Sequence, residues 1–201
     1  MERMRELSRK ASAHAAACES RYHGCAQCTL AGIQEALGIQ DDLLFRAATG
    51  LAAGGGLTTD GTCGAYTGAV MVMSSLFGRR RDRIDGDSDA KYRGFDLARR
   101  LHNRFLDHYG TLQCRAIHRQ TMGREFDLWD PEQKTDFEDA GAHSTHCPAV
   151  CGQAAGWAVE LLLREIERSG ITLEDVRREY EAVRCGDRRA GTESGAPADE
   201  I

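Results

Sequence analysis

The sequence has little of several features that would point to other classes of protein. Only 3 of its 201 residues are proline and 6% are aromatic, so long stretches are free to form helices and strand signals are weak. No stretch approaches the roughly 18 to 20 apolar residues that span a membrane, because the most apolar segment, residues 65–77, leads through Gly78 into three arginines. The first 20 residues lack the apolar core of a secretion signal. These absences predict a protein of a reducing compartment, the cytoplasm.

An excess of positive charge is also missing. The chain has 26 Lys and Arg against 31 Asp and Glu, a net charge of -5, so we expect neither nucleic acid nor an anionic membrane as a partner. With 41% hydrophobic residues the chain can bury a core, and its length fits one domain of roughly 100 to 200 residues. We expect a single helical domain over residues 1–185 and a disordered polar tail over 186–201.

Apolar residues recur at helical spacing, so the sequence predicts an all-α fold, a compact multi-helix bundle. The expected helices cover residues 3–18, 24–37, 41–53, 62–77, 90–109, 111–122, 148–168 and 173–183. Residues 54–61 form a glycine-rich loop and residues 79–89 a charged connector. Residues 123–146 show no clean period and contain Pro131, which indicates a long loop.

Cysteine, in contrast, is abundant, with eight residues in the chain. In a reducing compartment such a number indicates metal ligation or thiol chemistry rather than a disulfide framework. Six of them fall near the start of a predicted helix: Cys25, Cys28, Cys63, Cys114, Cys147 and Cys151. Cys18 and Cys185 lack this context, and we expect them to be incidental.

The start of a helix is a favourable place for a thiolate or for a sulfur bound to a metal. Unpaired backbone N–H groups and the helix dipole place partial positive charge there. Cys25 and Cys28 are three residues apart, and Cys147 and Cys151 are four apart, so each pair projects from one helix face. A single buried cysteine would be equally expected as core packing, but six at helix starts predict one cofactor or metal site that they share.

Local sequence suggests how these turns are capped. Thr62 would cap the turn that holds Cys63, and Thr111 the turn that holds Cys114. Cys147 would itself be the N-cap, because Pro148 is a good first helical residue.

Three histidines lie near these cysteines in sequence. His118 follows Cys114 by one helical turn, and His143 and His146 precede Cys147, so each could supply a proton or a ligand nitrogen. A surface position is the simpler expectation for each of them. Residues 25–28, Cys-Ala-Gln-Cys, are not followed by histidine, which excludes the c-type haem attachment motif.

The segment Cys63-Gly64-Ala65-Tyr66-Thr67-Gly68, with a glycine-rich loop before it, has one matching cysteine on its N-terminal side, Cys25, and two on its C-terminal side, Cys114 and Cys147. From about residue 23 to residue 163 the chain resembles a mostly bacterial and archaeal family of redox-active proteins known by the signature C_GCAxxG_C_C. The resemblance implies a redox role for the four signature cysteines. The cysteine layout is more distantly similar to that of split-Soret cytochromes, which combine haem with an iron-sulfur centre, although the haem motif is absent here. Cys28 and Cys151 exceed the signature, which suggests a different or larger centre.

Three functions therefore stand open. The first is an electron-transfer or oxidoreductase component that holds an iron-sulfur cluster of unspecified type with ligands drawn from the six cysteines. The second is a cofactor-free thiol-disulfide oxidoreductase in which Cys63 attacks. The third is a structural zinc module. In the first two, the partner is a redox protein or a small-molecule substrate that the sequence does not identify.

The sequence also predicts a cover over the cysteine site and an interface with a second copy of the chain. The segment 123–146 carries Phe126, Trp129 and Phe137 and leads directly into Cys147, so we expect it to cover the cysteine site and exclude water. The apolar helix over residues 65–77 could bury a second surface against another copy of the chain, so we also expect a homodimer.

Overall fold

The computed structural model describes residues 1–184 of the chain. Residues 185–201, which include Cys185 and the predicted disordered tail, lie outside the described part. The described residues form helices and no strand, with one isolated bridge between Thr62 and Gln113. The predicted all-α class is confirmed.

The elements follow one another along the chain with short connections. The α-helices are α1 (Glu2–Tyr22), α2 (Cys25–Leu37), α3 (Asp42–Ala47), α4 (Gly64–Phe77), α5 (Ser88–Tyr109), α6 (Cys114–Met122), α7 (Pro131–Asp139), α8 (Cys147–Arg168) and α9 (Leu173–Arg184). Two 3-10 turns, η1 (Thr49–Gly54) and η2 (Arg81–Arg83), and a π-helical turn, η3 (Ala142–His146), lie between them.

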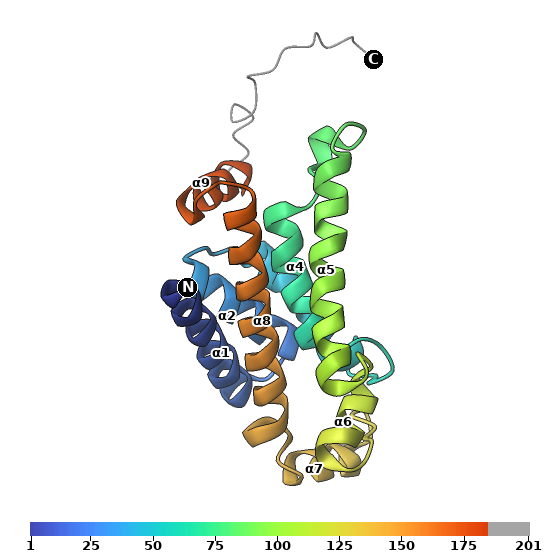
Figure 1. The fold of residues 1–201 in the computed structure, drawn as a ribbon. Helices are drawn as coiled ribbons and strands as arrows, with labels where there is room; N and C mark the ends of the chain where they lie inside the picture. Colours follow the sequence, from blue (N-terminus) through green and yellow to red (C-terminus); the bar gives the residue numbers. More distant parts are fainter. Residues whose placement is uncertain (185–201) are drawn as a thin grey trace.

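Helix α8 is the centre of the bundle. It packs against α1, α2, α4 and α5, and α2 packs in turn against α1 and α4. Figure 1 shows α6 and α7 together at one end of the bundle, at the beginning of α8, and α9 at the other end. The cysteine-bearing ends of α6 and α8 therefore lie at the same end of the molecule.

Small residues allow the helices of this bundle to approach closely. Ala11 and Ala15 of α1 are fully buried, and a Cβ atom added to Gly32 of α2 would lie only 2.7 Å from the Ala11 carbonyl oxygen and from the Ala15 side chain. Contacts this short require glycine at position 32. Because position 32 has no side chain, the backbones of α1 and α2 pack directly against each other.

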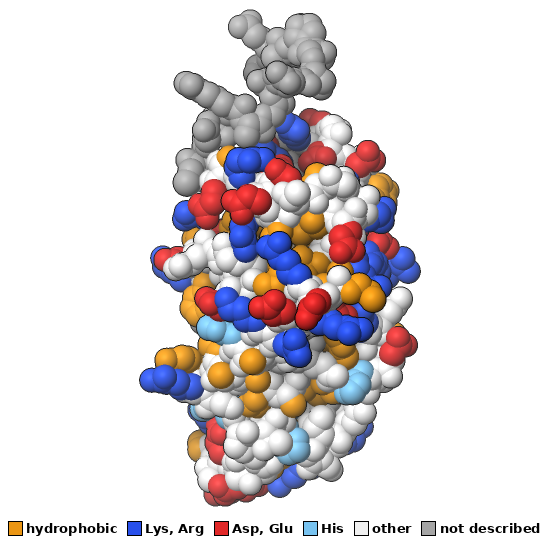
Figure 2. Space-filling model, turned by 60° about the vertical axis from the view of Figure 1, so that its left-hand side comes forward, with side chains coloured by type: hydrophobic (Ala, Val, Ile, Leu, Met, Phe, Trp, Pro, Cys, Tyr) orange, Lys and Arg blue, Asp and Glu red, His pale blue; other side chains and the backbone are white. Residues whose placement is uncertain are grey.

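One buried charge on α8 is balanced by arginines. The carboxylate of Glu165 is 1% exposed and pairs with Arg168 at 2.6 Å, Arg93 at 3.5 Å and Arg100 at 3.6 Å. On the face drawn in Figure 2, acidic and basic side chains are interleaved. None of the helices in residues 1–184 combines the length and the apolar character needed to cross a bilayer.

The helix predicted over residues 41–53 is wrong as a single element. The chain forms α3, stabilised by an N-cap hydrogen bond of 2.8 Å from the Leu44 N–H to the Asp41 carboxylate, and then the separate turn η1. Helix α3 ends at Ala47, and within η1 Ala52 is extended with ψ 144° and Ala53 is left-handed with φ 46°, so helical winding stops there. The break turns the backbone of Ala53 toward Cys25 of α2.

The loop predicted over residues 123–146 is also wrong in part. It contains helix α7 and the turn η3. Pro131 opens α7 instead of breaking it, because the first helical position needs no N–H, and Asp130 caps the helix by accepting hydrogen bonds from the N–H groups of Glu132 and Gln133. Phe137 is the one buried residue of α7, so the helix has no apolar period to detect.

Candidate functional site

Four helices start at a cysteine. Cys25, Cys114 and Cys147 are the first residues of α2, α6 and α8, and Cys63 is the N-cap of α4. Helix-start positions were predicted for all four. The predicted caps differ, since Cys63 itself rather than Thr62 precedes α4, Gln113 rather than Thr111 precedes α6, and His146 rather than Cys147 precedes α8.

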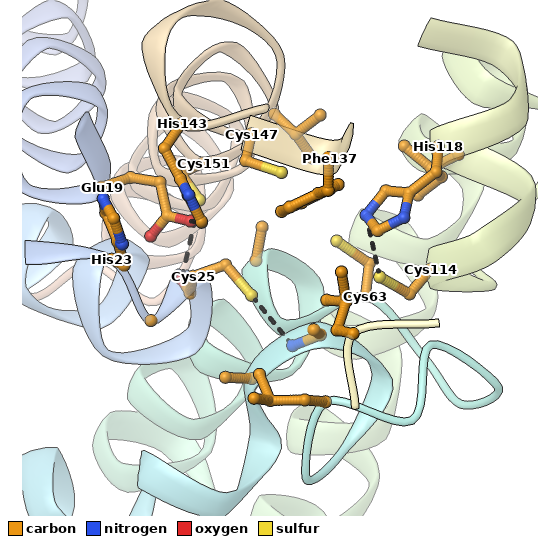
Figure 3. Close-up of a pocket in the computed structure, with 18 of the residues that line it drawn as sticks. Glu19, His23, Cys25, Cys63, Cys114, His118, Phe137, His143, Cys147 and Cys151 are labelled. Carbon is orange, nitrogen blue, oxygen red and sulfur yellow. Dashed lines mark hydrogen bonds and ion pairs between the residues drawn. The ribbon is translucent and has the colours of Figure 1, made fainter. Parts of the chain in front are cut away.

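These helix starts meet around one cavity of about 190 Å³. The cysteines that line it are Cys25, Cys63, Cys114, Cys147 and Cys151. Figure 3 shows them surrounding a common space, with α2 and α8 on one side and α6 on the other. Five of the six predicted site cysteines are thus brought together.

The signature glycines explain how α4 reaches this position. A Cβ atom at Gly64 would overlap the sulfur of Cys25, and a Cβ atom at Gly68 would overlap the carbonyl oxygen of Ala26. Both positions therefore require glycine if the start of α4 is to lie against the start of α2. This contact places Cys63 beside Cys25.

Several polar groups lie within hydrogen-bonding distance of the cysteine sulfur atoms. The Ala53 N–H donates to the sulfur of Cys25 at 3.4 Å, and the Cys151 thiol donates to the carbonyl oxygen of Cys25 at 3.7 Å. The sulfur of Cys114 lies 3.4 Å from Nε2 of His118. Backbone N–H groups near sulfur are the donors that stabilise thiolates and iron-sulfur clusters.

Burial makes these thiols poor acids. It raises the pKa of Cys63 to about 11, although the N–H groups of Ala65 and Tyr66 beside the sulfur oppose the effect. Burial also raises the pKa of Cys25, Cys114, Cys147 and Cys151 above the usual range, and the neighbouring thiols raise it further. Burial of this kind favours the neutral thiol over the thiolate unless a positive charge lies beside the sulfur.

The wall opposite α2 and α4 is aromatic. Phe126 and Phe137 are 2% and 3% exposed and pack on each other and on His118, and Phe137 lines the cavity. His118 is itself 4% exposed, so the surface position expected for it is wrong, and burial lowers its pKa to about 4. The segment 123–146 thus covers part of the cavity, but Trp129 is 72% exposed and donates to the Gly56 carbonyl oxygen instead.

Two residues of α1 and its C-terminal end were missed by the sequence analysis. Glu19 and His23 line the cavity together with Glu138 and His143. Glu19 is 1% exposed, and burial raises its pKa to about 7. Its spacing from the buried Ala11 and Ala15, in steps of four, places a carboxylate on the core-facing stripe of α1, and this signal could have revealed it.

The mouth of the cavity carries a group of titratable side chains. The His143 ring stacks on His23 with centroids 3.7 Å apart, and its Nδ1 lies 2.8 Å from the Glu138 carboxylate. His143 Nε2 lies 3.8 Å from Glu19. His23, Glu138 and His143 also bring one ligand atom each within 4.8 Å of one another. The two rings are nearly parallel, at 7°, so their lone pairs do not converge on one point as drawn in Figure 3.

Cys28 is separated from the other five predicted site cysteines. It is 1% exposed but is not among the residues that line the cavity, and its thiol donates to the carbonyl oxygen of His23 at 3.2 Å. Its side chain faces Cys18 on α1, a residue that the sequence analysis set aside. The three-residue spacing from Cys25 had suggested that both project to the same side, but residues three apart differ by about 60° around a helix, enough to reach two different neighbours.

The molecule is thus a helical protein with a thiol-lined cavity at the meeting point of four helix N-termini. Residues 23–161 match the model of the family described as "Putative redox-active protein (C_GCAxxG_C_C)", more than half of the chain, and the protein belongs to this family. Neither the curated proteins nor the solved structures contain a match to the chain. Membership assigns a redox role in general terms.

Proposed function

We propose that the protein binds an iron-sulfur cluster in the cavity and passes electrons between it and a redox partner, either a protein or a small molecule. The single observation that carries the proposal is the convergence of all four signature cysteines on one cavity, each at the start of its own helix. Cys25, Cys63, Cys114 and Cys147 would hold the cluster. When bound, the cluster supplies one-electron chemistry that thiols alone do not.

The residues present fit such a group. Four thiols match the usual ligand number of a cubane or rhombic cluster. The helix N-termini and the Ala53 N–H provide positive partial charge and hydrogen bonds to sulfur. Phe137, Ile117 and Val150 give the cavity apolar walls, which limit water access and thereby tune the redox potential.

A zinc site fits the geometry less well. Four thiolates around one zinc ion at 2.3 Å would place their sulfur atoms ~3.8 Å apart. Among the described residues, the group of three or more ligand atoms found within 4.8 Å of one another consists of His23, Glu138 and His143, with no cysteine sulfur. The sulfur atoms are spread around a larger space, which suits a cluster of several metal atoms.

A cofactor-free exchange reaction at Cys63 is also less well supported. Cys63 is 6% exposed, and an attacking thiol needs both access and a positive environment. Lys134 is the one lysine or arginine among the described residues that line the cavity. The buried thiols are better suited to ligation than to attack on a bulky disulfide.

Cys151 has a supporting place in this proposal. It is fully buried one helical turn after Cys147, lines the cavity, and donates to the backbone of Cys25. It would orient the start of α2 and could replace a signature ligand. We therefore expect Cys151→Ser to change the visible spectrum while iron is retained.

The test is anaerobic purification followed by quantification of iron, acid-labile sulfide and zinc, together with the visible spectrum. We expect iron and sulfide in equal amounts and broad visible absorption, and single Cys-to-Ser changes at positions 25, 63, 114 and 147 should each remove most of the iron. Cys18→Ser is the matched control, because this cysteine does not line the cavity. A colourless protein, or full iron content in Cys63→Ser, would overturn the proposal.

A further inference from the structure

Cys28 has a partner outside the cavity. Its thiol lies beside the thiol of Cys18, which belongs to α1 and is partly exposed. Cys28 itself is buried at the start of α2 and contacts the His23 carbonyl oxygen at 3.2 Å. One thiol of the pair is thus accessible and the other protected.

The packing of α1 on α2 holds this pair together. The two helices run in opposite directions, and the contact of Gly32 with Ala11 and Ala15 brings their backbones as close as side chains allow. Moving one turn along α1 from Ala15 and one turn back along α2 from Gly32 leads to Cys18 and Cys28. A disulfide needs Cα atoms about 4.4 to 6.8 Å apart, a separation that only helices in such close contact offer.

The two thiols also differ in access and in hydrogen bonding. Cys18 is partly exposed, whereas Cys28 is 1% exposed and donates its thiol proton to the His23 carbonyl oxygen at 3.2 Å. The exposed member is therefore the one that an incoming disulfide reaches first.

We propose that Cys18 and Cys28 form a second redox site, a dithiol that a low-molecular-weight disulfide oxidises to a disulfide bond between α1 and α2. This site lies outside the family signature and does not depend on a cluster in the cavity. Its substrate class is any small disulfide RSSR that reaches the surface of α1.

The reaction balances as two exchange steps. The Cys18 thiolate attacks one sulfur of RSSR, so that a Cys18–S–S–R bond forms and RS⁻ leaves. The Cys28 thiol then loses its proton and its sulfur attacks that of Cys18, forming the internal disulfide and releasing the second RS⁻. Both thiolates take up protons, so the net change is two protein thiols oxidised and RSSR reduced to two RSH.

Glu19 is placed to accept the proton of Cys28. Its buried carboxyl group lies beside the Cys28 thiol, one of its oxygens faces His143 Nε2 at 3.8 Å, and the other has no hydrogen-bond partner among the described residues. The contact through His143 to Glu138 leads the proton toward the surface. Glu19 would thus act as the general base of the second exchange step.

The experiment uses glutathione disulfide as the oxidant and the full chain as the protein. Trypsin cleaves after Arg21, so Cys18 falls in peptide 11–21 and Cys28 in peptide 22–46. After oxidation, alkylation of free thiols and digestion, mass spectrometry should find these two peptides linked. Fragmentation should assign the link to Cys28, and Cys25→Ser should retain it. No linked peptide at excess glutathione disulfide, or a link to Cys25, would overturn the proposal.

Single variants test the order of the steps. Cys28→Ser should accumulate glutathione on Cys18, whereas Cys18→Ser should leave Cys28 unmodified. Cys28→Ala, provided that its circular dichroism spectrum is native, repeats the first of these tests.

A variant of Glu19 tests the proton transfer. Glu19→Gln should slow formation of the internal disulfide roughly a hundredfold at neutral pH. Glu6→Gln, which changes an exposed carboxylate on α1 away from the two thiols, is its matched control. Glutathione on Cys28 in Cys18→Ser contradicts the order, and an unchanged rate in Glu19→Gln contradicts the role of Glu19. The iron content of Cys18→Ser, which should equal that of the wild type, separates this proposal from that of the cluster.

Discussion

At the scale of single residues, Glu19 is a carboxyl group in the protein interior. It is 1% exposed and has lost most of its hydration, and His143, Cys28 and the Glu138 carboxylate lie near its side chain. Burial of this kind favours the protonated form. Ionisation of Glu19 on the core face of α1 therefore destabilises the folded protein.

The pH dependence of stability follows from this ionisation. The pKa of Glu19 is raised from 4.5 to about 7, so the folded protein retains a proton that the unfolded chain releases. As pH rises from 4.5 to 7, this group should lower the free energy of unfolding by up to roughly 3 kcal/mol. Glu19→Gln is neutral throughout and should lack this decline. Denaturant unfolding of both proteins across the range checks it, and equal slopes would contradict it.

The signature glycine Gly68 gives a second prediction at this scale. In Gly68→Ala the added Cβ would overlap the Ala26 carbonyl oxygen, so α4 must move away from α2 and the free energy of unfolding should fall by more than about 3 kcal/mol. Gly50→Ala is the matched control, because a Cβ at Gly50 meets no atom within 4 Å. Thermal unfolding of the two variants compares them. Similar midpoints would show that the close contact is not required.

At the scale of elements, the apolar packing of α7 depends on a single side chain. Phe137 is the only buried residue of this helix, and it packs between His118, Phe126 and His143 at the wall of the cavity. The other side chains of α7 are mostly polar and exposed, and Glu138 adds a contact of 2.8 Å to His143. The apolar part of the attachment is therefore one aromatic side chain rather than an apolar stripe.

Removal of this contact should open the cavity. Phe137→Ala should cost about 3 to 5 kcal/mol in local stability and make Cys114 and Cys147 react faster with a maleimide, as read by mass spectrometry of the digested protein. Trp129→Ala is the control, since Trp129 is 72% exposed and its loss leaves the wall intact. Equal labelling rates in the two variants would contradict the role of α7 as a cover.

At the scale of the whole molecule, little of the apolar surface of α4 is left exposed for the predicted homodimer interface. The apolar helix α4 was expected to provide the interface, but its most apolar residues, among them Val72, Met73 and Phe77, are buried within the chain. Only partly buried residues such as Val70 and Met71 remain for a second copy. The homodimer stays a prediction, and light scattering of the purified protein checks it, since a monomer mass contradicts it.

The sequence by itself determined the helical class and the places where helices begin. Apolar spacing and stop residues are local properties, and so are the helix-start positions of Cys25, Cys63, Cys114 and Cys147, which the structure retains. Prediction from local sequence was wrong for the segments 41–53 and 123–146, which lack a regular apolar pattern or a uniform backbone conformation. Phe137 is the one buried residue of α7, and the segment 41–53 changes from α-helix to a 3-10 turn at Ala48 and leaves helical conformation at Ala52 and Ala53.

Only the tertiary structure decided which side chains share a site. Cys25 and Cys28 are three residues apart, yet one faces the cavity and the other faces Cys18, because α2 contacts α4 and α8 on one side and α1 on the other. The direction of a side chain follows from its helix, but its neighbours depend on how helices pack, and that packing is set by contacts such as Gly68 on Ala26 and Gly32 on Ala15, which join residues from separate helices. Sequence spacing does not encode such contacts. The spacing of Glu19 from Ala11 and Ala15 places it on the core face of α1, but its position beside the cysteines became visible only in the folded chain.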